Sequence, residues 1–240
     1  MKFLLLLICT IAFCWLLRKQ IRQAPWVFYL LAFALNLGLL ANQLFTLPFW
    51  AVSLLSPLMQ KGGLGVAFFV LVMWIGVFPR GGKLSKAFRP IRAELSITAC
   101  ILIAGHMSVY MVSYLPRFLA GLSVKPAVAV AFAIACVLLA LILLLGVTSL
   151  RAIKRHMSAR SWKKLQCLAY PFYGLVLIHL LLMLGPSALN GSAQSMVSVI
   201  VYILGFGGYL VARTMRAIAD KREAVDLAET VKDQGFNEDL

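Results

Sequence analysis

The sequence predicts an all-α fold, a polytopic bundle of about seven membrane-spanning helices. Hydrophobic residues make up 62% of the 240 residues, and the mean hydropathy is +0.92, whereas soluble domains are roughly half apolar. Apolar runs of about 20 residues recur, which is the length that an α-helix needs to cross a bilayer. Lys and Arg cluster in the short segments between these runs, so the net charge of +15 indicates membrane topology rather than nucleic-acid binding.

The apolar runs define the expected spans and divide the chain into three regions. Spans are predicted at 3–17, 26–45, 62–79, 94–115, 127–149, 166–184 and 195–212. Strong positive charge follows the first run, and no small-residue cleavage motif is present, so we expect a retained helix rather than a cleaved signal peptide. Residues 1–25 then form an extra N-terminal helix and basic loop, and residues 26–213 form the main transmembrane domain. Residues 214–240 form a cytoplasmic tail, expected as a short helix along the membrane with a disordered end.

The loops between the spans predict the orientation of the chain. Basic loops follow the first, third, fifth and seventh spans, whereas the loops after the other spans carry few Lys and Arg. The positive-inside rule requires this alternation when the N-terminus is outside and the C-terminus is cytoplasmic. The loop after the second span contains two prolines and a Gly pair, and we expect a short interfacial helix there with Trp50 among the headgroups. Asn36, within the second span, is expected to make an interhelical hydrogen bond.

Two histidines lie within apolar spans, where ionisable residues usually mark function. His106 lies 12 residues past Glu94, and His179 lies 13 residues past Gln166. Both rings are therefore expected about 18–20 Å from the cytoplasmic ends of two parallel spans. Matched depth is required if one iron is bound from both sides, so we predict that His106 and His179 hold one heme.

Gly105 and Gly174, near the two histidines, are expected to lower the local bulk where a porphyrin must fit. Two simpler interpretations of the histidines stay open, a structural hydrogen bond and the lining of a polar cavity. Zinc or copper is disfavoured, because no third ligand is placed at that depth apart from an unassigned cysteine. The cysteines form no C-x-x-C pair and are expected to be small buried hydrophobes: Cys9, Cys14, Cys100, Cys136 and Cys167.

Several short motifs accompany these spans. They are Phe78-Pro79-Arg80 at the end of a span, Arg92 ahead of the His106 helix, and Thr148-Ser149 followed by Arg160-Ser161-Trp162-Lys163-Lys164-Leu165-Gln166-Cys167-Leu168-Ala169-Tyr170 and His179. With these motifs the chain resembles the ferric-reductase-like transmembrane domain family, from about Phe69 to Leu184. The branch that it resembles most is the heme-binding membrane subunit of the bacterial periplasmic methionine sulfoxide reductase system.

The resemblance implies a six-helix core, preceded here by the extra N-terminal helix, in the bacterial plasma (inner) membrane. It implies one b-type heme near the outer face, with His106 and His179 as its ligands. Gln166 stands where the family usually has another His, and Arg92 stands where two-heme oxidases of the superfamily have an inner ligand. A second heme is therefore in doubt, and the inner site near Arg92 and Gln166 is expected to receive a quinol or a flavin instead. The alternative is that both are ordinary interfacial residues.

Four more residues are candidates for contact with the heme. Tyr110 and Tyr173 are expected to line its pocket, with ordinary aromatic packing as the alternative. Arg117 and Lys125 are the basic residues expected near the outer face, where they would meet the heme propionates, and Arg117 is the first choice.

The expected function is electron transfer, because two imidazole ligands leave no open position on the iron. The resemblance implies a quinol or cytoplasmic flavin donor and an extracytoplasmic reductase of the molybdopterin or FMN type as acceptor. No catalytic residue is assigned to this chain, since the final reduction would take place on the partner. The alternative from another class is a small heme-free transporter or membrane assembly factor. Against a transporter, no Asp or Glu lies in the middle of a span.

Overall fold

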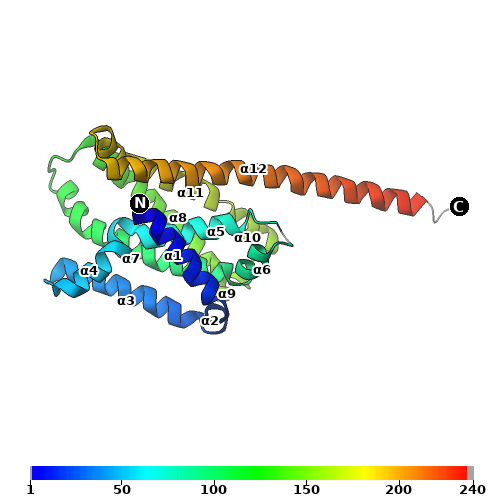
Figure 1. The fold of residues 1–240 in the computed structure, drawn as a ribbon, viewed down its shortest axis with the longest axis horizontal. Coiled ribbons are helices and arrows are strands. Elements are labelled where there is room, and N and C mark those ends of the chain that lie inside the picture. The colour runs from blue at the N-terminus through cyan, green and yellow to red at the C-terminus, as the bar shows by residue number, and fades with distance from the viewer. Residues whose placement is uncertain (1, 80, 237–240) are drawn as a thin grey trace.

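The computed structural model describes residues 2–79 and 81–236, which form helices joined by short loops (Figure 1). The helices are α1 (Lys2–Leu16), α2 (Arg18–Gln23), α3 (Pro25–Leu44), α4 (Phe49–Met59), η1 (Gln60–Gly62), α5 (Gly63–Ile75), α6 (Lys83–Phe88), η2 (Arg89–Ile91), α7 (Arg92–Leu119), α8 (Pro126–Ser149), α9 (Arg151–Lys154), α10 (Ala159–Gln166), α11 (Ala169–Leu189) and α12 (Ala193–Phe236). Arg80 of the Phe78-Pro79-Arg80 motif lies outside the described residues, as do the last four residues of the expected disordered end.

Six helical segments in the described part of the chain are long and apolar enough to cross a membrane. They are Pro25–Leu44, Phe49–Ile75, Lys83–Leu119, Pro126–Ser149, Ala159–Leu189 and Ala193–Glu223. The N-terminal region adds a shorter apolar helix, Phe3–Leu16. The predicted all-α bundle of about seven helices is therefore confirmed, and the chain is a multi-pass membrane protein.

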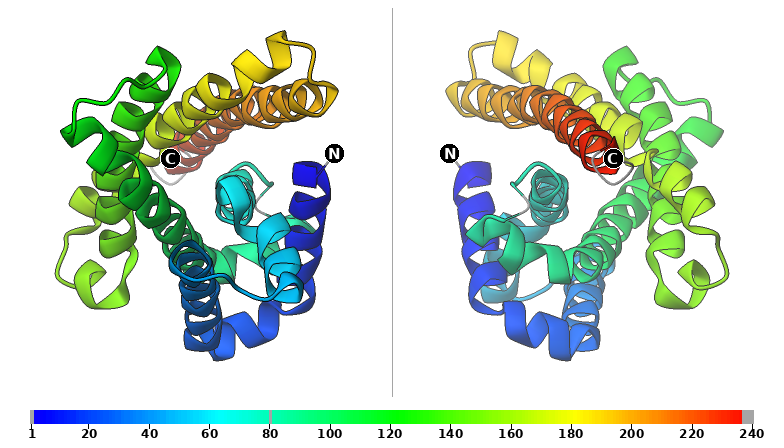
Figure 2. Two further views of the ribbon diagram at one scale, coloured as in Figure 1. Left: turned by 90° about the vertical axis from the view of Figure 1, so that its left-hand side faces the viewer. Right: turned by 90° about the vertical axis from the view of Figure 1, so that its right-hand side faces the viewer.

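The short helix α5 is the most enclosed element of the bundle. Every residue from Gly65 to Met73 is buried, and α5 packs against both α1 and α7. The end views in Figure 2 place α5 toward the middle of the bundle, with α11 and α12 side by side along one edge. A helix that is apolar on all sides belongs in an interior. The predicted span 62–79 is therefore a core helix, which ends at Ile75.

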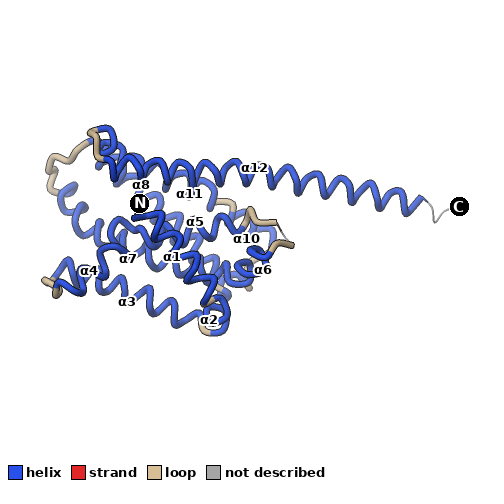
Figure 3. The backbone as a smooth tube through the Cα atoms, viewed as in Figure 1, coloured by secondary structure: helices blue, strands red, loops and turns tan. Residues whose placement is uncertain are grey.

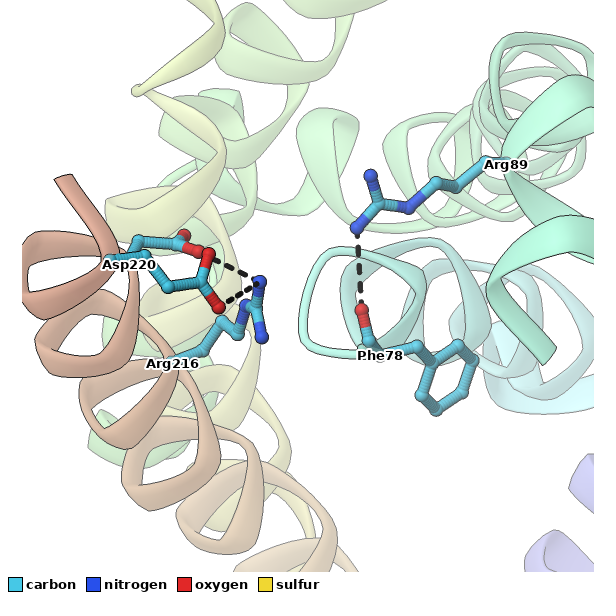
Figure 4. A network of polar contacts seen from close by, with 5 residues as sticks. Phe78, Arg89, Arg216 and Asp220 are labelled. Carbon is cyan, nitrogen blue, oxygen red and sulfur yellow. Dashed lines mark hydrogen bonds and ion pairs between the residues drawn. The ribbon is translucent and has the colours of Figure 1, made fainter. Parts of the chain in front are cut away.

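Two short elements lie before and after α5 in the chain. On one side, α4 forms the short helix expected after the second span, and Trp50 on it is 71% exposed. On the other side, the guanidinium of Arg89 in η2 donates a hydrogen bond to the Phe78 carbonyl at 3.3 Å (Figure 4). This bond ties the loop after α5 back onto the segment that leads into α7.

The contact between α3 and α7 explains Gly105. Asn36 Nδ2 of α3 donates a hydrogen bond to the Ile101 carbonyl of α7 at 2.5 Å, which confirms the expected interhelical bond. A Cβ added to Gly105 would overlap the Asn36 carboxamide. Gly174 is exposed on α11, and a Cβ there would meet nothing within 4 Å. The expectation that both glycines make room for a porphyrin is wrong, because Gly105 accommodates Asn36 and Gly174 faces outward.

α12 is one continuous helix that extends well beyond the rest of the bundle (Figures 1 and 3). The expected separate helix after Arg213 is wrong, because the described chain continues helical to Phe236 without a break. Residues 210–233 contain no Gly or Pro to interrupt a helix. Arg216 also forms an i,i+4 ion pair with Asp220 at 2.8 Å (Figure 4), an arrangement that stabilises helices by about 0.2–0.5 kcal/mol.

Candidate functional site

His106 of α7 and His179 of α11 line the same cavity. The cavity has a volume of about 190 Å³, whereas one water molecule needs only about 10–15 Å³. Most of its wall is apolar and aromatic, and α5, α7, α8 and α11 contribute to it. Representative lining residues are Val66, Phe69, Phe132, Leu138, Phe172 and Leu180. The matched depth of the two histidines in the sequence therefore corresponds to a shared site in the fold.

The His179 ring is oriented by a hydrogen bond to the neighbouring helix α8. Its Nδ1 lies 3.0 Å from the Ala131 carbonyl oxygen. A carbonyl oxygen can only accept, so the proton of a neutral ring must be on Nδ1. The lone pair is then on Nε2, which is the usual state of an imidazole that binds a metal. Ligating histidines commonly donate their other N–H to a carbonyl in this way.

The His106 ring is held between Gly62 and Tyr110. A Cβ added to Gly62 would lie 3.1 Å from His106 Cγ and 3.3 Å from Cδ2, so the ring packs directly on the Gly62 backbone. On the other side, the centroids of the His106 and Tyr110 rings are 4.7 Å apart. Tyr110 also lines the cavity, and its contact with a heme stays a prediction.

Tyr114 extends the same stripe of α7 beyond Tyr110, and sequence analysis did not identify it. The Tyr110 and Tyr114 rings are stacked, with centroids 6.0 Å apart and planes 8° apart, and both line the cavity. The spacing of four residues from His106 to Tyr110 to Tyr114 was the available signal, because residues four apart share a helix face. The Arg117 guanidinium lies over the Tyr114 ring, 5.5 Å from its centroid. Arg117 is thus beside the cavity without lining it.

Tyr173, the other tyrosine expected near the heme, does not line the cavity. Its ring stacks on Phe206 with centroids 4.1 Å apart, and meets Tyr209 edge-on at 4.9 Å. These contacts join α11 to α12. Tyr173 precedes His179 by six residues, which at 3.6 residues per turn rotates it by about 120° around the helix. The tyrosine of α12 that does line the cavity is Tyr202.

Lys61 is a cation that lines the cavity, and sequence analysis did not assign it to the site. It lies in η1, directly before the glycine that supports His106. Lys125, which was expected near the heme, instead precedes α8 as an exposed residue and does not line the cavity. The signal for Lys61 was weak, because a Lys before two glycines is also a common loop composition.

The inner residues Arg92 and Gln166 have different partners. Gln166 Nε2 donates a hydrogen bond to Thr148 Oγ1 at 3.2 Å, and Trp162 Nε1 donates to the Thr148 carbonyl at 3.0 Å. Trp162 and Gln166 of the basic motif therefore both contact Thr148 of the Thr148-Ser149 pair.

The Arg92 guanidinium instead lies beside the end of α5, where a Cβ added to Gly76 would be 3.9 Å from Arg92 Nη2. The phenol oxygen of Tyr170 accepts a hydrogen bond from Arg213 Nε at 3.0 Å. Arg92 is 14 residues before His106, about 21 Å along α7. Neither Arg92 nor Gln166 lines the histidine cavity.

The five cysteines are all free, and Cys14 is the one that is buried. Cys9, Cys136 and Cys167 are exposed on the apolar helices or at their ends. The expectation that the cysteines are buried hydrophobes therefore holds for Cys14 and is wrong for these three. None of the five lines the histidine cavity.

Comparison with known proteins found a distant relative. An uncharacterized protein of Treponema pallidum (strain Nichols) is 37% identical to this chain over 175 residues. The matched region covers 72% of this chain and 48% of that protein, so the chain spans about half the length of the relative. No family model and no solved structure matches this chain.

Proposed function

We propose that this chain is a membrane electron-transfer protein that binds one b-type heme between His106 and His179. The observation that carries the proposal is that both imidazoles line one apolar cavity from different helices. His179 supports it further, because its Nδ1 donates to Ala131 and leaves Nε2 for a metal. The resemblance to ferric-reductase-like membrane domains points in the same direction.

The residues around the cavity fit a heme. Apolar and aromatic side chains make up most of the wall, and such a wall suits a flat, apolar macrocycle. Lys61 lines the cavity and Arg117 lies over a tyrosine that lines it, so cations are available for acidic substituents. The donor set is two imidazoles, which matches the bis-histidine ligation of b-type electron-transfer hemes and is poor for zinc, which takes three or four protein ligands.

His106 and His179 would hold the heme, and the chemistry that it would supply when bound is one-electron transfer. The chain's own residues set the conditions for that chemistry. The bond from His179 to the Ala131 carbonyl fixes the ring orientation and raises the basicity of the ligand. Gly62 and Tyr110 hold the His106 ring from two sides. Apolar and aromatic side chains surround both rings, and such surroundings are one means by which a protein sets the potential of a heme.

The proposal includes a direction for the electrons. The basic loops favour a cytoplasmic C-terminus in the bacterial plasma membrane, with the N-terminus outside. Electrons would then come from quinol or a cytoplasmic flavin donor and leave toward an extracytoplasmic reductase of the molybdopterin or FMN type. Arg92, the first residue of α7, is the place at which we propose that a quinol or flavin donor approaches.

An optical spectrum of the purified full-length chain tests the proposal. The protein is expressed with heme supplied, purified in detergent, and compared with His106→Ala, His179→Ala and His156→Ala variants. His156 is the matched control, because it is the third histidine and is exposed outside the cavity. We expect a dithionite-reduced b-type spectrum and about one heme per chain in the wild type and His156→Ala, and loss of heme in the other two. A colourless wild type, as a heme-free transporter would be, or undiminished heme in those two variants, would contradict the proposal.

A further inference from the structure

The turn between α4 and α5 has an unusual backbone at the edge of the cavity. Lys61 has φ 58° and ψ 20°, and Gly62 has φ 68° and ψ 17°. Lys61 is the one non-glycine residue with positive φ among the described residues. Side chains other than Gly seldom adopt this conformation, and such residues cluster at functional sites. Glycine would adopt this backbone without strain, so we infer that the lysine side chain itself has a function here.

The same two residues contact the histidine site directly. The Gly62 backbone packs on the His106 ring, and Lys61 lines the cavity that contains both rings. In this left-handed turn, Gly62 packs on the imidazole, and Lys61, the residue before it, lines the cavity. Any ligand held by His106 would lie within reach of this turn.

Lys61 lines the cavity and Arg117 lies beside it, whereas acidic residues are far along the chain from the residues that line it. Glu94 is the only acid before Asp220. Glu94 lies 12 residues from His106 on α7, about 18 Å along the helix. Asp220 lies 18 residues past Tyr202, which lines the cavity, or about 27 Å along α12. Both acidic residues thus lie far along their helices from the cavity, and the exposed Lys61 is the cation at its edge that a carboxylate of the ligand could meet.

We propose that Lys61 forms an ion pair with a carboxylate of the ligand in this cavity. The inference rests on the proposed function, in which the ligand is heme and the carboxylate is one of its propionates. Lys61 is then a positioning residue, because it fixes the rotation of the macrocycle between the two imidazoles. Arg117, whose guanidinium lies 5.5 Å from the centroid of the Tyr114 ring, is the candidate for the second propionate.

A binding cycle separates the charge of Lys61 from the shape of its turn. Apoprotein in detergent is titrated with hemin and with hemin dimethyl ester, which has the same macrocycle without the carboxylates. The variants are Lys61→Met, which removes the ammonium, and Lys61→Gly, which removes it and also relaxes the turn. Lys125→Met is the matched control, since Lys125 is an exposed lysine that does not line the cavity. His106→Ala measures non-specific hemin binding.

We expect both Lys61 variants to raise the dissociation constant for hemin by roughly three- to tenfold, the effect of losing one charge-assisted contact near a surface. The ester should bind all variants except His106→Ala about equally, because it has no carboxylate to pair. Equal hemin affinity in wild type and Lys61→Met would overturn the inference, and so would the same loss with the ester. A wild type that binds hemin no better than His106→Ala would overturn both the inference and the proposed function.

Discussion

Gly62→Ala tests whether the α4–α5 turn holds His106 in position. The new Cβ would lie 3.1 Å from His106 Cγ, 3.3 Å from Cδ2 and 3.4 Å from Nδ1, so the ring must move by a few tenths of an ångström. The backbone adds a second cost, because Gly62 has φ 68° and a left-handed conformation costs a residue with a Cβ about 1–2 kcal/mol. The substitution therefore changes both the fold and the ligand geometry.

Gly121→Ala is the control that separates these two effects. Gly121 has φ 64°, and a Cβ added there would meet nothing within 4 Å, so alanine at this position carries the backbone cost alone. Both variants should lower the thermal midpoint in detergent by about 2–8 °C, since 1 kcal/mol corresponds to about 2–4 °C in a chain of this size. Only Gly62→Ala should also weaken hemin binding.

The size of that binding effect follows from the displaced ring. Forcing a side chain about 30° from its rotamer costs about 0.5–1.5 kcal/mol, which is roughly a two- to tenfold rise in the dissociation constant. Titration with hemin measures it, and low-spin EPR signals of the ferric protein report the ligand geometry independently. If Gly62→Ala and Gly121→Ala bind hemin equally and give the same EPR signals, the turn does not position His106.

Two further pairs of substitutions test the packing of two glycines and two tyrosines that the sequence placed near the heme. Gly105→Ala should destabilise the protein by about 1–3 kcal/mol, because its Cβ overlaps Asn36 and overpacking costs this much, whereas Gly174→Ala should be neutral or stabilising by up to about 1 kcal/mol, as measured by thermal unfolding. Tyr110→Ala should weaken hemin binding several-fold, because it removes the ring beside His106. Tyr173→Ala should cost about 3–5 kcal/mol of unfolding free energy while leaving hemin affinity unchanged, since its ring packs between α11 and α12; weaker hemin binding in Tyr173→Ala alone would contradict this assignment.

The helices and the pairing of the two histidines were accessible from the sequence. Long apolar runs are sufficient to locate spans, because the bilayer fixes the length of a crossing helix. Equal distances of His106 and His179 from the starts of parallel helices were sufficient to place them at one level. The helix face on which a residue lies was harder to predict than its depth. A spacing of four residues puts Tyr110 on the same face as His106, whereas a spacing of six puts Tyr173 on a different face from His179.

The contribution of the α4–α5 turn was not accessible, because it depends on how two segments meet in space. Lys61 and Gly62 reach the cavity only because α5 packs against α7 with the turn at the level of His106. Gly105 was misassigned for a similar reason, since its sequence neighbour His106 faces the cavity while Gly105 itself faces Asn36 of α3. Nothing in the local sequence distinguishes a glycine that admits a ligand from one that admits a neighbouring helix.

The length of α5 supplies a physical reason for a cavity at this place. Its 13 residues rise about 20 Å, which is shorter than the hydrocarbon core of about 30 Å. The turn that begins α5 meets His106, the fifteenth residue of the 28-residue helix α7, and so lies at membrane depth. Irregular backbone is tolerated at this depth only where protein buries it or where it lines a cavity. A short central helix therefore leaves space beside its first turn, and that space is where the structure gathers Lys61, His106 and His179.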